Sequence, residues 1–124
     1  MTQKNIFFSI IGLLILGTLG VIFLQPPKTT IPSTKYDELA QCLASQKLTM
    51  YGAVWCSHCQ AQKALFGSSF QYVPYVECTE NPDRCVAEGI TGYPTWIDEK
   101  GTKYEGEQSL EKLGEISGCQ LPVN

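Results

Sequence analysis

The sequence of 124 residues predicts an α/β fold, a small mixed β-sheet flanked by helices, preceded by one N-terminal transmembrane helix. Three observations lead to this fold class. An uncharged apolar run covers residues 6–24, short apolar runs alternate with helix-like patterns beyond it, and a C-x-x-C pair directly follows the apolar run 48–54. The chain has room for one domain of modest size and not for two.

The run 6–24 is apolar apart from Ser9, Thr18 and the glycines. At about 1.5 Å per residue, a helix of this length spans close to the ~30 Å hydrocarbon core of a bilayer. A cleaved secretory signal is the alternative, because Lys4 supplies the positive start that both kinds of segment share. Signal segments are usually shorter and end at a small-residue cleavage site, and none follows Leu24. We therefore expect an uncleaved signal anchor.

Residues 25–34 are rich in proline and threonine and lack apolar periodicity, which is typical of a stiff, extended linker. The folded domain is expected over residues 35–120. Its first helix is expected to be capped by Ser33 or Thr34 and to end near Ser45. The apolar residues of this helix fall at the spacing i, i+3, i+4, i+7, which predicts one buried stripe made of Tyr36, Leu39, Ala40 and Leu43.

Two strands are expected on either side of a second helix. The apolar run 48–54 predicts a buried strand, and residues 57–66 predict a helix that ends at Gly67. Residues 72–78 alternate enough to form a second strand. Pro74 within it favours an edge position, because proline cannot donate a hydrogen bond to a neighbouring strand.

The last third of the chain predicts a helix, a hairpin and a helix. The first of these helices starts near Pro82, since proline suits the first helical turn, and stops at Gly89. Residues 95–105 predict a hairpin with a glycine-containing turn. Ser109 is expected to cap a final helix over residues 110–116.

The charge balance indicates which partners to expect, and the number of cysteines indicates the cellular compartment. Nine Lys and Arg stand against twelve Asp and Glu, spread without blocks, so there is no basic patch and no nucleic-acid partner is expected. Six cysteines are many for the hundred or so residues beyond the apolar run, and an even count suits an oxidising compartment. We therefore expect a single-pass membrane protein whose domain lies on the extracytoplasmic side, periplasmic or lumenal.

The C-x-x-C pair consists of Cys56 and Cys59 and lies where a strand leads into a helix. Free N–H groups and the helix dipole at a helix start favour an anion, so Cys56 is expected to be the thiolate nucleophile. Cys59 follows one helical turn later and is expected to resolve a mixed disulfide. His58, when protonated, adds positive charge near that thiolate and makes the pair a better oxidant. The expected redox group is this disulfide alone, without a further cofactor.

Simpler interpretations remain for these residues, namely a structural disulfide and, for His58, an exposed residue without a role. The tight C-x-x-C ring and the exposed helix start favour labile redox chemistry. Cys78 and Cys85, spaced C-x6-C, do not match a zinc knuckle, so no metal site is expected. The four cysteines outside the pair allow three pairings, and an electron relay through one of those pairs is a further alternative.

Residues 54–59, with Trp55 beside the first cysteine, and Tyr93-Pro94 downstream are the most distinctive motifs. With the element order they resemble the thioredoxin superfamily over residues 34–119. The resemblance implies that Pro94 follows a cis peptide bond and packs against the active-site disulfide. It also implies that the backbone of Tyr93 pairs with an extended substrate strand. Trp55 is expected to line the same substrate groove.

A narrower resemblance is to the thioredoxin-like domain attached to bacterial homologues of vitamin K epoxide reductase. In those fusions a membrane quinone reductase and the thioredoxin-like domain share one chain. Here the resemblance implies a separate quinone-reducing membrane partner of that type. It also implies that Cys78 pairs with Cys85, which leaves Cys42 to join Cys119, both pairs being structural. The stretches that carry this resemblance are 51–56, 59–63, 74–78, 92–96 and 106–110.

Three functions follow from these residues. The first, which we predict, is a membrane-anchored extracytoplasmic thiol–disulfide oxidoreductase that forms disulfides in exported proteins, whose thiols are its substrates. The second is the same chemistry in the opposite direction, as an extracytoplasmic disulfide reductase. The third is a non-catalytic module that binds unfolded peptides or a soft metal ion through the same groove and thiols.

Overall fold

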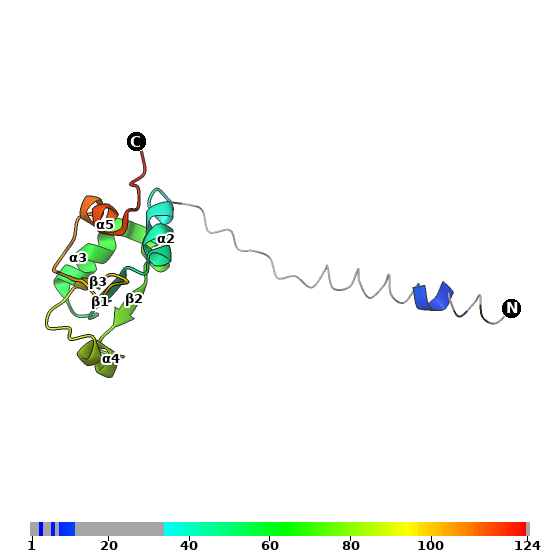
Figure 1. The fold of residues 1–124 in the computed structure, drawn as a ribbon, viewed down its shortest axis with the longest axis horizontal. Coiled ribbons are helices and arrows are strands. Elements are labelled where there is room, and N and C mark those ends of the chain that lie inside the picture. The colour runs from blue at the N-terminus through cyan, green and yellow to red at the C-terminus, as the bar shows by residue number, and fades with distance from the viewer. Residues whose placement is uncertain (1–2, 4–5, 7, 12–33, 124) are drawn as a thin grey trace. The chain divides into compact units, whose positions relative to one another are not determined.

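The computed structural model describes residues 3, 6, 8–11 and 34–123 of the chain (Figure 1). The chain divides into two units, residues 1–31 and 32–124, and each is described by itself. In the first unit, the described residues are helical, and Ile6, Phe8, Ile10 and Ile11 are exposed.

Most of the predicted transmembrane helix, residues 6–24, and all but the last residue of the predicted linker, residues 25–34, lie outside the described residues. Within the part of the chain that is described, no helix combines the length and the apolar character needed to cross a membrane.

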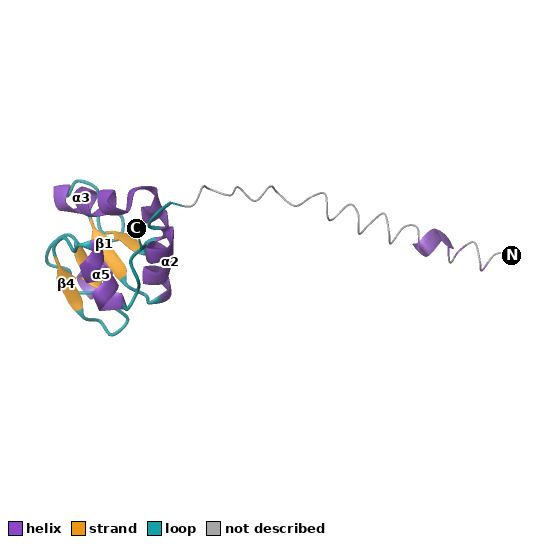
Figure 2. Cartoon of the chain, turned by 90° about the horizontal axis from the view of Figure 1, so that it is seen from above, coloured by secondary structure: helices purple, strands orange, loops and turns teal. Residues whose placement is uncertain are grey.

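The second unit contains four α-helices, one 3-10 helix and four strands in the described range 34–123. In chain order they are α2 (Asp37–Ser45), β1 (Thr49–Gly52), α3 (Ser57–Phe66), η1 (Gly67–Tyr72), β2 (Tyr75–Glu77), α4 (Pro82–Ala87), β3 (Thr95–Ile97), β4 (Lys103–Glu105) and α5 (Leu110–Ser117). The strands lie among the helices (Figure 2). The predicted α/β class and the order of the predicted helices and strands are confirmed.

The four strands form one mixed sheet in the order β2-β1-β3-β4. Strand β1 pairs in parallel with β2, whereas the pairs β1–β3 and β3–β4 are antiparallel. Met50 of β1 and Trp96 of β3 are register partners and belong to the larger apolar cluster, together with residues of α2, α3 and α5. Tyr51, Val76 and Ile97 belong to a smaller cluster that includes Cys78 and, from α4, Cys85. This division follows the alternation of side chains along a strand.

Strand β2 lies at the edge of the sheet, as Pro74 predicts. The carbonyl of Pro74 accepts a hydrogen bond from Met50 N–H at 2.9 Å, so proline precedes the strand without interrupting its pairing. The predicted strand 72–78 is nevertheless too long, because Tyr72 ends the 3-10 helix η1 and the observed strand covers only Tyr75–Glu77. Phe70 of this helix packs edge-on against Phe66 and Tyr75 of the two neighbouring elements, a contact that alternation alone does not reveal.

The predicted first strand and first cap are also wrong in part. Strand β1 ends at Gly52, because Cys56 N–H donates to the carbonyl of Ala53 at 3.0 Å and closes a turn. Helix α2 begins at Asp37 after the cap residue Tyr36, and no side chain caps it. Thr34 instead donates from its N–H and its hydroxyl to the Asp37 carboxylate, at 2.9 and 2.6 Å. The predicted apolar stripe of the helix is confirmed, with Leu39, Ala40 and Leu43 buried and Tyr36 partly buried.

Gln62 joins helix α3 to the sheet and to the segment before α5. Its buried side-chain oxygen accepts hydrogen bonds from Trp96 Nε1 at 3.3 Å and from Gln108 N–H at 2.7 Å. Its Nε2 donates to the carbonyl of Gln108 at 2.9 Å. The bond from Trp96 ties helix α3, which follows the cap residue Cys56, to strand β3, and the two bonds with Gln108 tie it to the segment before α5.

Replacing Gln62 by leucine is therefore expected to lower the free energy of unfolding by about 2–3 kcal/mol, because it leaves buried partners unsatisfied. Urea unfolding of the two proteins measures this difference. The matched control is Gln71→Leu at an exposed position of η1, which is expected to change stability by less than about 0.5 kcal/mol. Equal effects of the two substitutions would contradict this role of Gln62.

Candidate active site

The turn between β1 and α3 places the two cysteines of the pair. Cys56 is the N-cap residue of α3, and its Sγ accepts a hydrogen bond from Cys59 N–H at 3.2 Å. Both cysteines are free thiols. Cys56 retains 7% exposure, whereas Cys59 is fully buried. Of the two sulfur atoms, that of Cys56 is therefore the one open to a reacting partner.

The segment before β3 lies against the same thiol. The Cys56 thiol donates to the carbonyl of Tyr93, with 3.7 Å between sulfur and oxygen. The peptide bond between Tyr93 and Pro94 is cis, as the resemblance implies, and Pro94 is buried. Two segments that are 37 residues apart in the sequence thus meet at one sulfur atom.

A groove of about 440 Å³ opens over this meeting point. The Trp55 ring, 69% exposed, lies edge-on to the Tyr93 ring with 5.8 Å between their centroids. The residues that line the groove are Trp55, Cys56, Ser57, His58, Thr91, Gly92 and Tyr93. Of the predicted site residues, the groove brings together Cys56, His58, Trp55 and Tyr93, while Cys59 and Pro94 are buried.

His58 has a partner that the sequence did not indicate. Its Nδ1 lies 2.5 Å from Oε1 of Glu107, which precedes α5. Both side chains are substantially exposed. The Glu107 carboxylate therefore lies beside the imidazole whose positive charge we expected to stabilise the Cys56 thiolate. A separation of 49 residues hides this pair from any motif search.

Burial dominates the chemistry of Cys59. Loss of solvent, together with the hydrogen bond to Cys56, raises the pKa of the Cys59 thiol to about 12. The backbone at Ala53 and the charge of Lys63 act in the opposite direction but do not outweigh burial. Cys59 is therefore a thiol at neutral pH and not a competing nucleophile.

The other four cysteines form two disulfides. Cys42 of α2 is joined to Cys119, which follows α5, and Cys78 is joined to Cys85 of α4. These are the pairs that the narrower resemblance implies. All four residues lie outside the groove. In the described part of the chain, no group of three or more His, Cys, Asp or Glu residues is placed to hold a metal ion.

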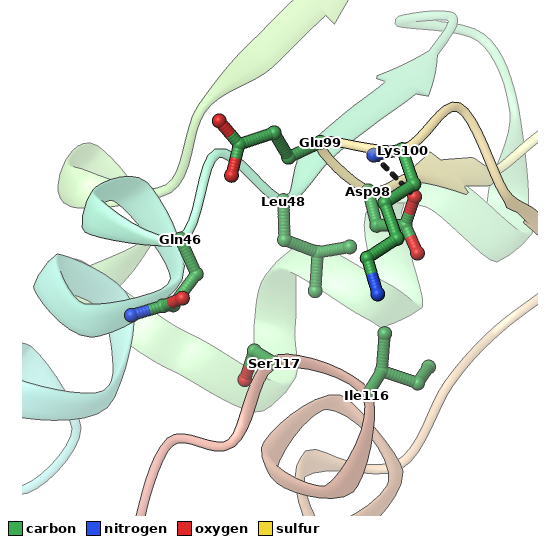
Figure 3. Close-up of a pocket in the computed structure, with 7 residues that line it drawn as sticks. All are labelled: Gln46, Leu48, Asp98, Glu99, Lys100, Ile116 and Ser117. Atoms are coloured by element: carbon green, nitrogen blue, oxygen red, sulfur yellow. Dashed lines mark hydrogen bonds between the residues drawn. The ribbon is translucent and has the colours of Figure 1, made fainter.

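A second hollow, of about 200 Å³, lies at the opposite end of β1 (Figure 3). The side chains of Leu48 and Ile116 point toward each other across it, and Lys100 N–H donates to the Asp98 carboxylate at its edge. None of the predicted site residues lines this hollow.

The sequence is similar to parts of known redox proteins, although no protein-family model matches it. It is 39% identical over 92 residues to the thiol-disulfide oxidoreductase LTO1 of Arabidopsis thaliana, covering 67% of this chain and 24% of that protein. It is 35% identical over 91 residues to the protein disulfide isomerase-like 2-2 of Oryza sativa subsp. japonica, covering 62% and 24%. The chain thus spans about a quarter of the length of these relatives.

Among solved structures, the chain is similar to chloroplastic thioredoxin z, with a TM-score of 0.46 and 22% identity over 68% of this chain and 88% of that one. The sequence similarity to redox proteins and the C-x-x-C pair at the start of α3 agree. Residues 34–123 therefore form a domain of the thioredoxin-like superfamily, of the kind found in thiol–disulfide oxidoreductases.

Proposed function

We propose that this chain is a thiol–disulfide oxidoreductase that transfers its Cys56–Cys59 disulfide to thiols of exported proteins. The observation that carries the proposal is the arrangement of the two cysteines. Cys56 caps α3 and lines a groove, and Cys59 lies buried behind it within reach of the same sulfur. A pair with one accessible and one buried sulfur is suited to forming and resolving a mixed disulfide.

The reaction begins when a substrate thiolate attacks Cys56 Sγ of the oxidised pair. A substrate–Cys56 disulfide forms, the Cys56–Cys59 bond breaks, and the Cys59 sulfur takes up a proton. A second substrate thiolate then attacks the mixed disulfide, so that the substrate leaves with a disulfide and Cys56 leaves as a thiolate. Two electrons pass from the substrate dithiol to the pair. An extended substrate segment would lie against Trp55 and the Tyr93 backbone.

The setting of this reaction is part of the proposal. Residues 6–24 anchor the chain in a membrane, and the domain lies on the extracytoplasmic side. The exposed apolar side chains of Ile6, Phe8, Ile10 and Ile11 support the anchor, and the two disulfides of the domain support an oxidising compartment. A quinone-reducing membrane protein of the vitamin K epoxide reductase type reoxidises the pair.

A stoichiometric reaction tests the chemistry. The oxidised full chain, in detergent, is mixed with a reduced peptide that contains two cysteines, and all thiols are then alkylated and located by mass spectrometry. We expect one peptide disulfide per chain and new labels on Cys56 and Cys59 only. A peptide that stays reduced would contradict the proposed function, and labels on Cys78 and Cys85 would indicate a relay through that pair.

A disulfide reductase is the second candidate, and the ion pair of His58 with Glu107 favours it. A carboxylate beside the groove opposes a thiolate at Cys56, and a less stable thiolate makes the disulfide a weaker oxidant. The direction of electron flow therefore depends on the balance of these two charges.

Replacing Glu107 by glutamine is expected to raise the reduction potential of the Cys56–Cys59 pair by about 10–20 mV, because an exposed charge pair contributes less than about 1 kcal/mol. Equilibration with glutathione buffers measures the potential. Glu111→Gln, at an exposed position in the first turn of α5, is the charge-matched control and should leave the potential unchanged. A potential that falls in Glu107→Gln would contradict this role.

A further inference from the structure

Cys59 must gain and lose a proton in every reaction cycle, yet its side chain has no exposed surface. The proposed function requires this proton to leave when Cys59 resolves a mixed disulfide and to return when Cys59 is the leaving group. A buried thiol whose pKa is raised to about 12 is almost entirely protonated at pH 7. A nearby group that accepts the proton would remove this barrier.

Gly52 of β1 lies close to both the buried Cys59 sulfur and the Tyr75 hydroxyl. A Cβ atom built on Gly52 would lie 3.0 Å from Cys59 Sγ and 3.2 Å from the hydroxyl oxygen of Tyr75. Both atoms therefore border the same small space beside β1. The glycine, which has no side chain, leaves this space open. The thiol sulfur and the phenol oxygen lie across it, without a hydrogen bond between them in this structure.

The Tyr75 hydroxyl is hydrogen-bonded to the carboxylate of Glu77. It donates a hydrogen bond to Oε2 of Glu77 at 2.6 Å. The other carboxylate oxygen accepts from Val54 N–H at 3.0 Å and from the Thr79 hydroxyl at 2.7 Å. Glu77 is only partly buried, so its carboxylate connects the hydroxyl beside Cys59 with solvent.

We propose that Tyr75 and Glu77 form the proton path of Cys59, in which the Tyr75 hydroxyl passes the proton between the buried sulfur and the Glu77 carboxylate. The inference rests on the proposed thiol–disulfide exchange and assigns two residues to one step of it. The hydrogen bond from the Tyr75 hydroxyl is what selects Glu77 for this role.

The charges around Cys59 fit this assignment. Lys63 of α3 has its Nζ 3.7 Å from the centroid of the Tyr75 ring, and its charge favours a thiolate at Cys59. Cys56, from the turn before α3, opposes that thiolate. Strand β2 contributes Tyr75 and Glu77, the two members of the path.

The two members of the path differ in protonation. Burial raises the pKa of the Glu77 carboxyl, but hydrogen bonds from Tyr75, Thr79 and Val54 outweigh burial and hold the pKa below its ordinary value. Glu77 is therefore in its accepting form at neutral pH. Burial and the hydrogen bond to Glu77 raise the pKa of Tyr75, so Tyr75 hands on a proton without being a base itself.

The resolving step starts from a mixed disulfide in which the Cys56 sulfur is bonded to the sulfur of a substrate, R. Cys59 sulfur attacks Cys56 Sγ, a Cys56–Cys59 bond forms, and the bond to R breaks so that R leaves as a thiolate. The Cys59 proton moves to Tyr75 oxygen while the Tyr75 proton moves to Glu77. Glu77 then releases its proton to solvent, and the reverse reaction uses the same path in the opposite direction.

The test follows two successive releases of a coloured thiolate. The full chain in detergent, with Cys56 and Cys59 reduced and both structural disulfides intact, is mixed with an equimolar amount of dithiobis(nitrobenzoate). Attack by Cys56 releases the first aromatic thiolate, and attack by Cys59 on the mixed disulfide releases the second. Stopped-flow absorbance separates the two rates. The variants are Glu77→Gln and Tyr75→Phe, and the controls are Glu80→Gln, which is exposed, and Tyr72→Phe.

We expect the second release to slow by about 100-fold at pH 7 in both variants, the lower end of what a positioned proton acceptor contributes. The first release and the controls should be unchanged. Between pH 6 and 8 the second rate should be nearly constant in the unmodified chain, because carboxylate and thiol are then the reacting forms. In Glu77→Gln it should rise about tenfold per pH unit, since only preformed thiolate reacts.

Two outcomes would overturn the assignment. One is a second release with the same rate and pH profile in the unmodified chain and in both variants, and the other is an equal slowing of both releases, which would indicate a structural role. An unmodified chain that releases one thiolate or none would instead contradict the proposed function. Tyr75→Phe keeps the ring, so it tests the path even where Glu77→Gln weakens the loop around Thr79.

Discussion

Replacing Cys56 by alanine is expected to reduce thiol–disulfide exchange by at least about 1,000-fold, because it removes the attacking atom itself. Cys56 is the one sulfur of the described residues that lines the groove, and Cys59 is buried and protonated at neutral pH. The reduction of a protein disulfide by the chain in detergent, with a small dithiol as electron source, measures the loss after subtraction of the uncatalysed rate.

Cys59→Ala is the matched variant, and its expected result is different. It should still attack through Cys56, but the mixed disulfide with substrate should accumulate, since the resolving thiol is absent. Non-reducing electrophoresis separates this adduct from the free chain. An adduct that forms through any other cysteine, or equal activity of Cys56→Ala and the unmodified chain, would refute the assignment of the nucleophile.

Removing the Cys42–Cys119 disulfide by a double alanine substitution is expected to lower the free energy of unfolding by about 4.5 kcal/mol on the chain-entropy relation. The bond joins residues 77 positions apart and ties α2 to the segment after α5. A domain of this size is stable by only about 5–15 kcal/mol, so the variant should be close to unfolding at 37 °C. Urea unfolding with the C-x-x-C pair kept oxidised measures the difference.

The other disulfide supplies the control. Cys78 and Cys85 are only 7 positions apart, and their removal is expected to cost about 2.4 kcal/mol on the same relation. The ranking of the two double variants is therefore the prediction. If removal of the Cys78–Cys85 disulfide lowered the free energy of unfolding more than removal of the Cys42–Cys119 disulfide, the entropy of the unfolded chain would not determine how much each disulfide stabilises the domain.

The order of the elements could be predicted because each has a local signal. Proline before β2 and glycine after α3 determine where elements begin or end, and Ser109 caps α5 through the hydrogen bond from Lys112 N–H. The 3-10 helix η1 has no such signal. Its Phe70 packs against rings of α3 and β2, a packing effect that acts between elements.

The candidate site was predictable as far as its motif extends. Cys56, His58 and Trp55 lie within four consecutive positions, and Tyr93 precedes a proline. Glu107 and Tyr75 were not predicted, because their roles depend on contacts across the fold. Glu107 reaches His58 from 49 positions away, and Tyr75 and Cys59 border the same space only because Gly52 lacks a side chain.

The reduction potential of the Cys56–Cys59 pair tests the proposed direction of electron flow most directly. The full chain in detergent is equilibrated with glutathione buffers, and the fraction of reduced pair is determined by alkylation. We expect a potential between about −120 and −180 mV, the range of proteins that donate disulfides. A potential near −270 mV, that of a reducing thioredoxin, would contradict disulfide donation and identify the chain as a reductase.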